Sequence, residues 1–253
     1  MPSLRLIALA VFAAAAFGAA ACGGDDTTAT TATTAAATNT ATVAKTVSAA
    51  DAYGAMAAEL EKATYPADLI DGKNIGKKDA KVVIQMYEDF TCSHCLEFTA
   101  SSEPGIIENS VKTGVARLEF HYLPLRQSSV AIMVAAECAA TQDKFWEYQK
   151  KLFIVQAGAD AKPQEQYAQA LSDGFGDTAL KQYARDLGLD GAKFDDCYTN
   201  PQAAVAVVQK DLETSTTLGI RGTPGFVING QYLANGYPAN PADWKTLIQS
   251  KAK

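Results

Sequence analysis

The sequence has only two histidines, and just one closely spaced pair occurs among its five cysteines. A structural zinc site usually takes its four ligands as two close pairs, and no second CxxC motif is present, so zinc binding is disfavoured. The sequence also has no basic stripe: its net charge is −6, with both signs spread along the chain. Nucleic-acid binding therefore lacks its usual electrostatic signature.

The N-terminal apolar run is too short to favour a permanent membrane span. Residues 6–21 (LIALAVFAAAAFGAAA) are mostly alanine, and Arg5 is the only charged side chain before Asp25. A basic start followed by a short apolar stretch is the layout of a secretory signal peptide. We therefore predict a signal peptide at residues 1–21 and an exported protein, with an uncleaved anchor as the alternative.

Cys22 follows three alanines at the expected cleavage point. This arrangement resembles the lipobox of bacterial lipoproteins, although Ala19 stands where leucine is usual. The resemblance implies that Cys22 is acylated and anchors the protein at the outer face of the cytoplasmic membrane. Ordinary secretion, with Cys22 as a free thiol, is the alternative; a lone reactive thiol at a secreted N-terminus is unfavourable.

The next stretch predicts a linker rather than a folded segment. Residues 23–46 are rich in threonine and alanine, contain no aromatic residue and have Val43 as their one branched aliphatic side chain. Such a segment cannot bury enough apolar surface to offset the entropy lost on ordering. We therefore expect a disordered linker at 22–47 and one domain at 48–253.

The pattern of apolar residues in this domain predicts an α/β fold. Two β-branched or alternating segments, 81–87 and 116–123, predict strands on either side of a helix. A block of helices follows at about 127–215, and then two short strands joined at Asn229-Gly230 and a final helix. The order indicates a βαβ unit and a ββα unit around a mixed sheet, separated by a helical insertion.

The cysteine pair lies in the stretch E-D-F-T-C-S-H-C, residues 88–95, directly after the first predicted strand. Cys92 is expected at the start of the following helix, where free N–H groups and the helix dipole stabilise a thiolate. His94, if protonated, adds a second favourable charge, and both effects lower the pKa of Cys92. Cys95, one turn further on, would be shielded. The positions favour a redox couple.

Other functions of the Cys92/Cys95 pair have less support from the sequence. A cysteine hydrolase with Cys92 as nucleophile and His121 as base is possible on paper, but a second cysteine three residues away would trap the nucleophile as a disulfide. A structural clip gains little, because closing so short a loop removes little chain entropy.

Two motifs in this order, D-F-x-C-x-x-C at 89–95 and G-I-R-G-T-P-G-F-V-I-N-G at 219–230, resemble the DsbA-like thiol-disulfide oxidoreductases of the thioredoxin superfamily. The resemblance covers about residues 70–250 and implies a thioredoxin fold. It implies that Cys92 is the attacking thiol and Cys95 the resolving thiol. The dipeptide between them, Ser93-His94, departs from the many members that carry proline first, which makes the motif less rigid. The resemblance also implies a cis peptide bond at Thr223-Pro224 that faces the cysteines and binds substrate.

The same resemblance implies a function. It indicates an enzyme without a bound cofactor that oxidises reduced exported proteins and is reoxidised by a quinone-linked membrane protein, DsbB-like or VKOR-like. An isomerase is the alternative within the class, but isomerases of this superfamily usually dimerise through an additional N-terminal domain, so we expect a monomer and an oxidase. A reductase, or a peptide-binding surface lipoprotein whose CxxC is only a clip, also remains open.

Three features depart from the family pattern or extend it. The glutamate that many members carry six residues before the first cysteine is replaced by Met86. Glu88 and Asp89 lie at the strand end, where side chains can point to solvent, so we assign no proton acceptor to Cys95. Cys138 and Cys197, on different predicted helices, would join the helical block if bridged; two buried free thiols are the alternative.

Overall fold

The computed structural model describes residues 47–253. The predicted signal peptide, Cys22 and the linker up to residue 46 lie outside this part of the chain. The first helix, α1 (Ala49–Lys62), begins where the Ser48 hydroxyl accepts a hydrogen bond from the backbone N–H of Asp51. This N-cap satisfies one of the free N–H groups of the first turn.

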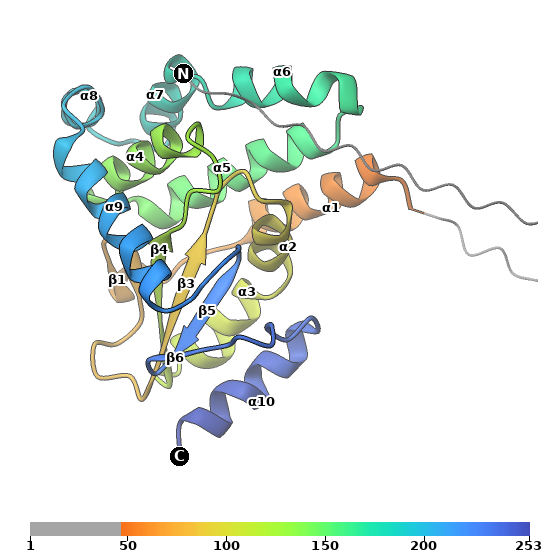
Figure 1. The fold of residues 1–253 in the computed structure, drawn as a ribbon, viewed down its shortest axis with the longest axis vertical. Helices are drawn as coiled ribbons and strands as arrows, with labels where there is room; N and C mark the ends of the chain where they lie inside the picture. Colours follow the sequence, from red (N-terminus) through yellow and green to blue (C-terminus); the bar gives the residue numbers. More distant parts are fainter. Residues whose placement is uncertain (1–46) are drawn as a thin grey trace, which may run out of the picture. The chain divides into compact units, whose positions relative to one another are not determined.

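A six-stranded mixed sheet forms the centre of the domain, in the order β1-β2-β4-β3-β5-β6 (Figure 1). The two central strands are parallel, and β5 pairs with β3 in the antiparallel direction. The strands are β1 (Ile70–Asp71), β2 (Asn74–Ile75), β3 (Val82–Glu88), β4 (Ala116–Tyr122), β5 (Gly225–Ile228) and β6 (Gln231–Tyr232). The predicted thioredoxin fold with a helical insertion is thus confirmed.

The crossover from β3 to β4 is helical but interrupted. It consists of α2 (Ser93–Ser101), α3 (Glu103–Ile106) and a π-helical turn (Ile107–Val111). The break falls at Ser102, and Pro104 lies in the first turn of α3. Proline is tolerated there because its missing N–H would have no helical partner in any case. The single helix predicted between the two strands is therefore divided into α2 and α3.

The helical insertion lies between β4 and β5. In Figure 1 its helices α4 to α8 gather at one end of the sheet, and α9 returns alongside it. They are α4 (Ser129–Ala140), α5 (Phe145–Asp160), α6 (Gln164–Gly174), α7 (Asp177–Asp186), α8 (Gly191–Thr199) and α9 (Gln202–Thr217). The helix α10 (Pro241–Lys251) closes the chain.

Aromatic side chains form the core on both faces of the sheet. Phe90 stacks on Phe120 with ring centroids 5.4 Å apart. Phe226 contacts Phe98 of α2 and Trp244 of α10, with centroid distances of 4.7 and 4.9 Å. The crossover helices and α10 therefore share one apolar layer, which fixes the position of α2 against β5.

At two places the structure goes beyond the predicted pattern, and at a third it confirms the prediction. Within the predicted block of helices, the segment 128–153 is divided into α4 and α5, and Asp143 between them has a positive φ of 55°. The turn at 71–74 belongs to a hairpin, β1–β2, that the sequence pattern did not indicate. The predicted turn at Asn229-Gly230 is confirmed, with φ values of 49° and 80°.

Candidate active site

Cys92 lies at the junction between β3 and α2. It is the N-cap residue of α2, with extended backbone angles (φ −98°, ψ 117°), and only 8 % of it is exposed. At this position the free N–H groups of the first helical turn, including those of His94 and Cys95, are directed toward its sulfur. The short chain segment between strand and helix therefore provides an anion site for a thiolate.

The pKa of the Cys92 thiol is lowered from 9.0 to about 5. The main cause is the hydrogen bond with the Cys95 thiol, followed by bonds from the Thr223 side chain and from the backbone of Cys95 and His94. These bonds outweigh the burial of the sulfur, which acts in the opposite direction. At neutral pH Cys92 is thus mainly a thiolate when the pair is reduced.

Cys95 is completely buried, and burial raises the pKa of its thiol well above the ordinary value. Its hydrogen bond with Cys92 and the negative charge of Glu88 act in the same direction. The two sulfurs, both free thiols in this structure, therefore differ strongly in acidity. The Cys92 sulfur is the reactive thiolate, and the Cys95 sulfur remains protonated.

The loop before β5 faces the cysteines. The Thr223-Pro224 peptide bond is cis, and the Thr223 carbonyl oxygen lies 3.4 Å from the Cys92 sulfur. The Thr223 hydroxyl oxygen is buried. Gly225 follows because a Cβ there would lie 2.5 Å from the Ile220 side chain. The loop thus packs closely against the redox pair.

Glu88 and Asp89 are both fully buried, so neither side chain points to solvent. Neither carboxyl oxygen of Glu88 has a hydrogen-bond partner within residues 47–253. Burial raises the pKa of Glu88 well above 4.5, and the nearby charges of Glu103 and Cys92 act in the same direction. An acid beneath the cysteines therefore exists, but two residues after Met86.

A second buried acid, Glu103, lies behind the first. Its carboxyl accepts hydrogen bonds from Tyr65 (3.2 Å), which precedes it in the chain, and from Gln149 of α5 (3.0 Å). Burial raises the pKa of Glu103 to about 7, and the two hydrogen bonds counteract part of that effect. No local sequence pattern indicates this group, because its partners are 38 and 46 residues away.

Asp89 holds the cysteine-bearing loop in place. One oxygen accepts hydrogen bonds from the backbone N–H and the hydroxyl of Thr91 (2.8 and 2.9 Å), and the other accepts from the backbone N–H of Leu125 (2.7 Å). The carboxylate thus ties the residue before Cys92 to the loop between β4 and α4.

The remaining predicted residues take different positions. His94 is exposed and Ser93 is half-buried, both in the first turn of α2. His121 stacks on Tyr87, and its Nδ1 atom lies 2.8 Å from Asp211 of α9. It is not brought to the cysteines, so nothing supports the cysteine-hydrolase alternative.

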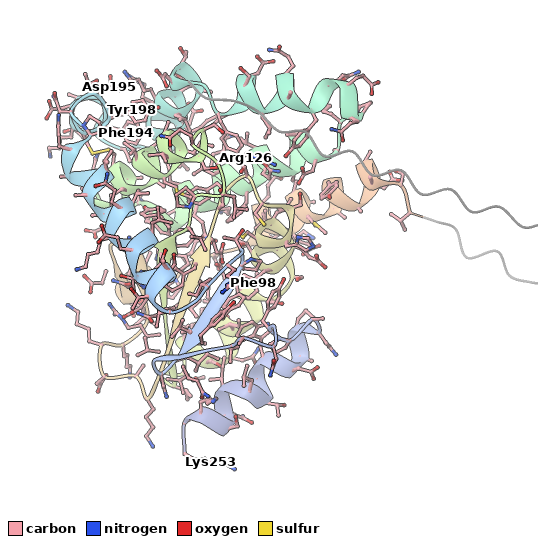
Figure 2. All side chains as sticks on the ribbon, viewed as in Figure 1. Phe98, Arg126, Phe194, Asp195, Tyr198 and Lys253 are labelled. Carbon is pink, nitrogen blue, oxygen red and sulfur yellow. A yellow bond between two sulfur atoms is a disulfide. The ribbon has the colours of Figure 1, made fainter. Side chains whose placement is uncertain are left out.

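Cys138 of α4 and Cys197 of α8 form a disulfide, which lies near Phe194 and Tyr198 (Figure 2). Within residues 47–253 no group of three or more His, Cys, Asp or Glu side chains is placed to hold a metal ion. No helix in that range is both long and apolar enough to span a membrane.

Comparison with known proteins agrees with the thioredoxin fold. A family model described as thioredoxin matches residues 68–250. Disulfide bond formation protein D of Bacillus subtilis is 24% identical over 169 residues, which cover 64% of this chain and 69% of that protein. The Na(+)/H(+) antiporter NhaA 3 of Salinispora tropica is 28% identical over 62% of this chain, but the match spans only 21% of the antiporter.

Solved structures share the fold at low identity. BdbD from Bacillus subtilis has a TM-score of 0.59 and 18% identity, covering 75% of this chain and 96% of BdbD. The α-DsbA1 protein of Wolbachia pipientis has a TM-score of 0.57 and 21% identity, covering 77% and 96%. At these identities the likeness concerns the fold.

Proposed function

Because the chain belongs to the thioredoxin family, we propose that it is an extracytoplasmic thiol-disulfide oxidoreductase that introduces disulfides into exported proteins through Cys92 and Cys95. The observation that carries the proposal is the contrast between the two sulfurs: the pKa of Cys92 is lowered to about 5, while that of buried Cys95 is raised. Catalysts of thiol–disulfide exchange need one accessible, easily ionised sulfur and one shielded sulfur.

The reaction begins with the disulfide form. A substrate thiolate attacks the Cys92 sulfur, a mixed disulfide forms, and the Cys92–Cys95 bond breaks with its electron pair on Cys95. The second substrate thiolate then attacks the substrate sulfur of the mixed disulfide. The substrate disulfide forms, Cys92 leaves as a thiolate, and the enzyme has gained two electrons. Thr223 and Pro224, beside Cys92, bind the substrate backbone.

Glu88 donates a proton to the buried Cys95 sulfur and accepts it back. When Cys95 leaves as a thiolate in an apolar interior, it must gain a proton, and the neutral carboxyl of Glu88 can supply it. During reoxidation the same carboxylate takes the proton back. This role fits a buried acid that has no fixed hydrogen-bond partner in the described chain.

The lowered pKa favours oxidation of substrates. At pH 7 a thiol with a pKa of about 5 in place of 9.0 is stabilised by roughly 2.7 kcal/mol in its reduced form. By the relation for a two-electron couple, this raises the reduction potential by about 60 mV. Stabilising the reduced form makes the disulfide the stronger oxidant.

A redox partner and a location complete the proposal. Each cycle leaves the enzyme reduced, so a quinone-linked membrane protein, DsbB-like or VKOR-like, would restore the disulfide. Acylation of Cys22 would hold the monomer at the outer face of the cytoplasmic membrane, near such a partner.

The test is oxidative refolding of a reduced, disulfide-containing protein by the wild type and by Cys92→Ser, together with the reduction potential of the 92/95 couple. We expect catalysis by the wild type only and a potential well above the about −270 mV of thioredoxin. Equal refolding with both proteins would leave only the peptide-binding alternative, and a potential at or below that value would exclude the oxidase.

A further inference from the structure

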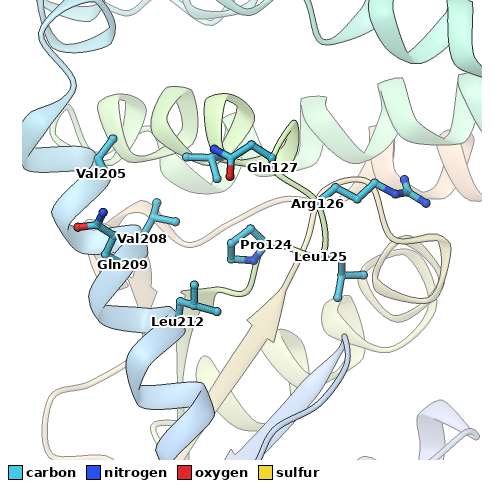
Figure 3. Close-up of a pocket in the computed structure, with 9 residues that line it drawn as sticks. Pro124, Leu125, Arg126, Gln127, Val205, Val208, Gln209 and Leu212 are labelled. Carbon is cyan, nitrogen blue, oxygen red and sulfur yellow. The ribbon is translucent and has the colours of Figure 1, made fainter. Parts of the chain in front are cut away.

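Two hollows meet beside the cysteine-bearing loop, on the side of the insertion. The larger, of ≈ 520 Å³, lies between that loop, α4 and α6; its apolar walls include Ile132, Leu171 and Phe175, and Thr91 lines it next to Cys92. The smaller, of ≈ 360 Å³, lies between the β4–α4 loop and α9 (Figure 3). We call the two together the Arg126 surface, since Arg126 borders both.

This surface is held at a fixed distance from the redox pair. The Asp89 carboxylate binds the Thr91 backbone with one oxygen and the Leu125 backbone with the other. Thr91 precedes Cys92, and Leu125 precedes Arg126. Anything bound at Cys92 therefore lies next to the Arg126 surface, which continues the substrate site.

The surface is apolar with a single charge. Leu125 and Leu212 are 50% and 40% exposed, the largest values for a leucine in the described chain, and both line the smaller hollow. Arg126 is the one charged residue on either hollow, and it forms no salt bridge with any described residue. In Figure 3 the Arg126 side chain lies at the end of the smaller hollow that is opposite α9, and it points away from that helix.

We propose that the Arg126 surface binds the polypeptide around a substrate cysteine, and that it prefers an acidic side chain next to a large apolar one. The apolar side chain enters the hollow lined by Leu171 and Phe175, and the carboxylate pairs with Arg126. Two exposed leucines and an unpaired guanidinium, on a surface that reaches Thr91 next to the reactive Cys92, match this chemistry. The inference rests on the proposed function and gives it a substrate preference.

Two variants test it, each with a matched control. Arg126→Glu reverses the charge, and Lys210→Glu makes the same change on α9, outside both hollows. Ala168→Trp fills the larger hollow from an exposed position of α6, and Gln166→Trp adds the same ring elsewhere on that helix. The substrates are dithiothreitol and three synthetic dithiol peptides that differ beside one cysteine: Leu-Glu, Leu-Gln or Ser-Gln.

For the wild type we expect kcat/KM to fall in the order Leu-Glu, Leu-Gln, Ser-Gln. Arg126→Glu should lower kcat/KM for Leu-Glu about fivefold, through KM, with little effect on Leu-Gln. Ala168→Trp should lower kcat/KM for both leucine peptides. Dithiothreitol oxidation, the reduction potential and both controls should be unchanged.

Two results would overturn the inference. The first is an equal kcat/KM of the wild type for all three peptides. The second is an Arg126→Glu variant whose rate falls only when membranes reoxidise the enzyme, which would assign the surface to the reoxidase. Both leave the proposed function intact. That function fails separately, if the wild type oxidises neither the peptides nor dithiothreitol.

Discussion

Cys92 and Cys95 are separated by two residues, yet their environments act on them in opposite directions. Cys92 caps α2 and receives the N–H groups of the first helical turn, whereas Cys95 lies inside the turn, fully buried and near the carboxyl of Glu88. Hydrogen bonds to the thiolate lower one pKa; desolvation and a like charge raise the other. The asymmetry that exchange chemistry requires thus comes from one helical turn and one buried acid.

Glu88→Gln tests that acid. Without a group to give and take the Cys95 proton, the rate of peptide oxidation should fall about 10²-fold. The pKa of Glu88 is raised by burial, so the folded state resists its ionisation and loses stability as pH rises above 4.5. The variant should therefore be more stable than the wild type at pH 7, and the difference should disappear below pH 4.5, as measured by urea denaturation.

Glu103→Gln is the control, because its carboxyl is hydrogen-bonded to Tyr65 and Gln149. It should slow oxidation much less than Glu88→Gln. If Glu88→Gln oxidised peptides at the wild-type rate, the proton would have to reach Cys95 by another route.

At the scale of elements, the site depends on how β3 connects to α2. β3 lies between β4 and β5, so its end brings the cysteines to the cis-Pro loop that precedes β5. Asp89 then links the start of α2 to the β4–α4 loop, across 36 residues of sequence. One carboxylate thereby sets the position of the attacking sulfur and of the Arg126 surface.

Asp89→Asn should lower the free energy of unfolding by about 2 kcal/mol, because the amide NH₂ cannot accept one of the three bonds and the charge is lost. Asp190→Asn makes the same change at the exposed N-cap of α8, where asparagine serves as well, and should cost less than about 0.5 kcal/mol. Urea denaturation measures both free energies of unfolding. Equal losses in the two variants would mean that the buried hydrogen bonds of Asp89 stabilise the fold no more than an exposed N-cap does.

At the scale of the whole molecule, a disulfide links two helices of the insertion. The Cys138–Cys197 disulfide links α4, which is buried against the core, to α8 across 59 residues. The helix α9 then returns to the sheet, where Asp211 accepts bonds from His121 and from the Tyr122 backbone of β4. These contacts hold the insertion against the thioredoxin core.

The double variant Cys138→Ala/Cys197→Ala should lose about 4 kcal/mol of stability, the chain-entropy value for a loop of this length. The reduction potential of the 92/95 couple should stay the same, since the disulfide lies outside the redox site. Guanidinium denaturation and redox titration check the two expectations. A loss well under 1 kcal/mol would mean that packing alone holds α8.

The sequence alone determined the features that depend on neighbours along the chain. The CxxC after a strand, the Asn229-Gly230 turn and the order of strands and helices could be predicted because local periodicity and turn chemistry control them. Only the tertiary structure decided that Glu88 is buried near Cys95, that Glu103 lies behind it, and that Arg126 borders the same hollow as Thr91, the residue before Cys92. These relations depend on how β3, α2, α3 and the β4–α4 loop pack together, and burial, which sets the pKa of each acid, exists only once those elements have packed.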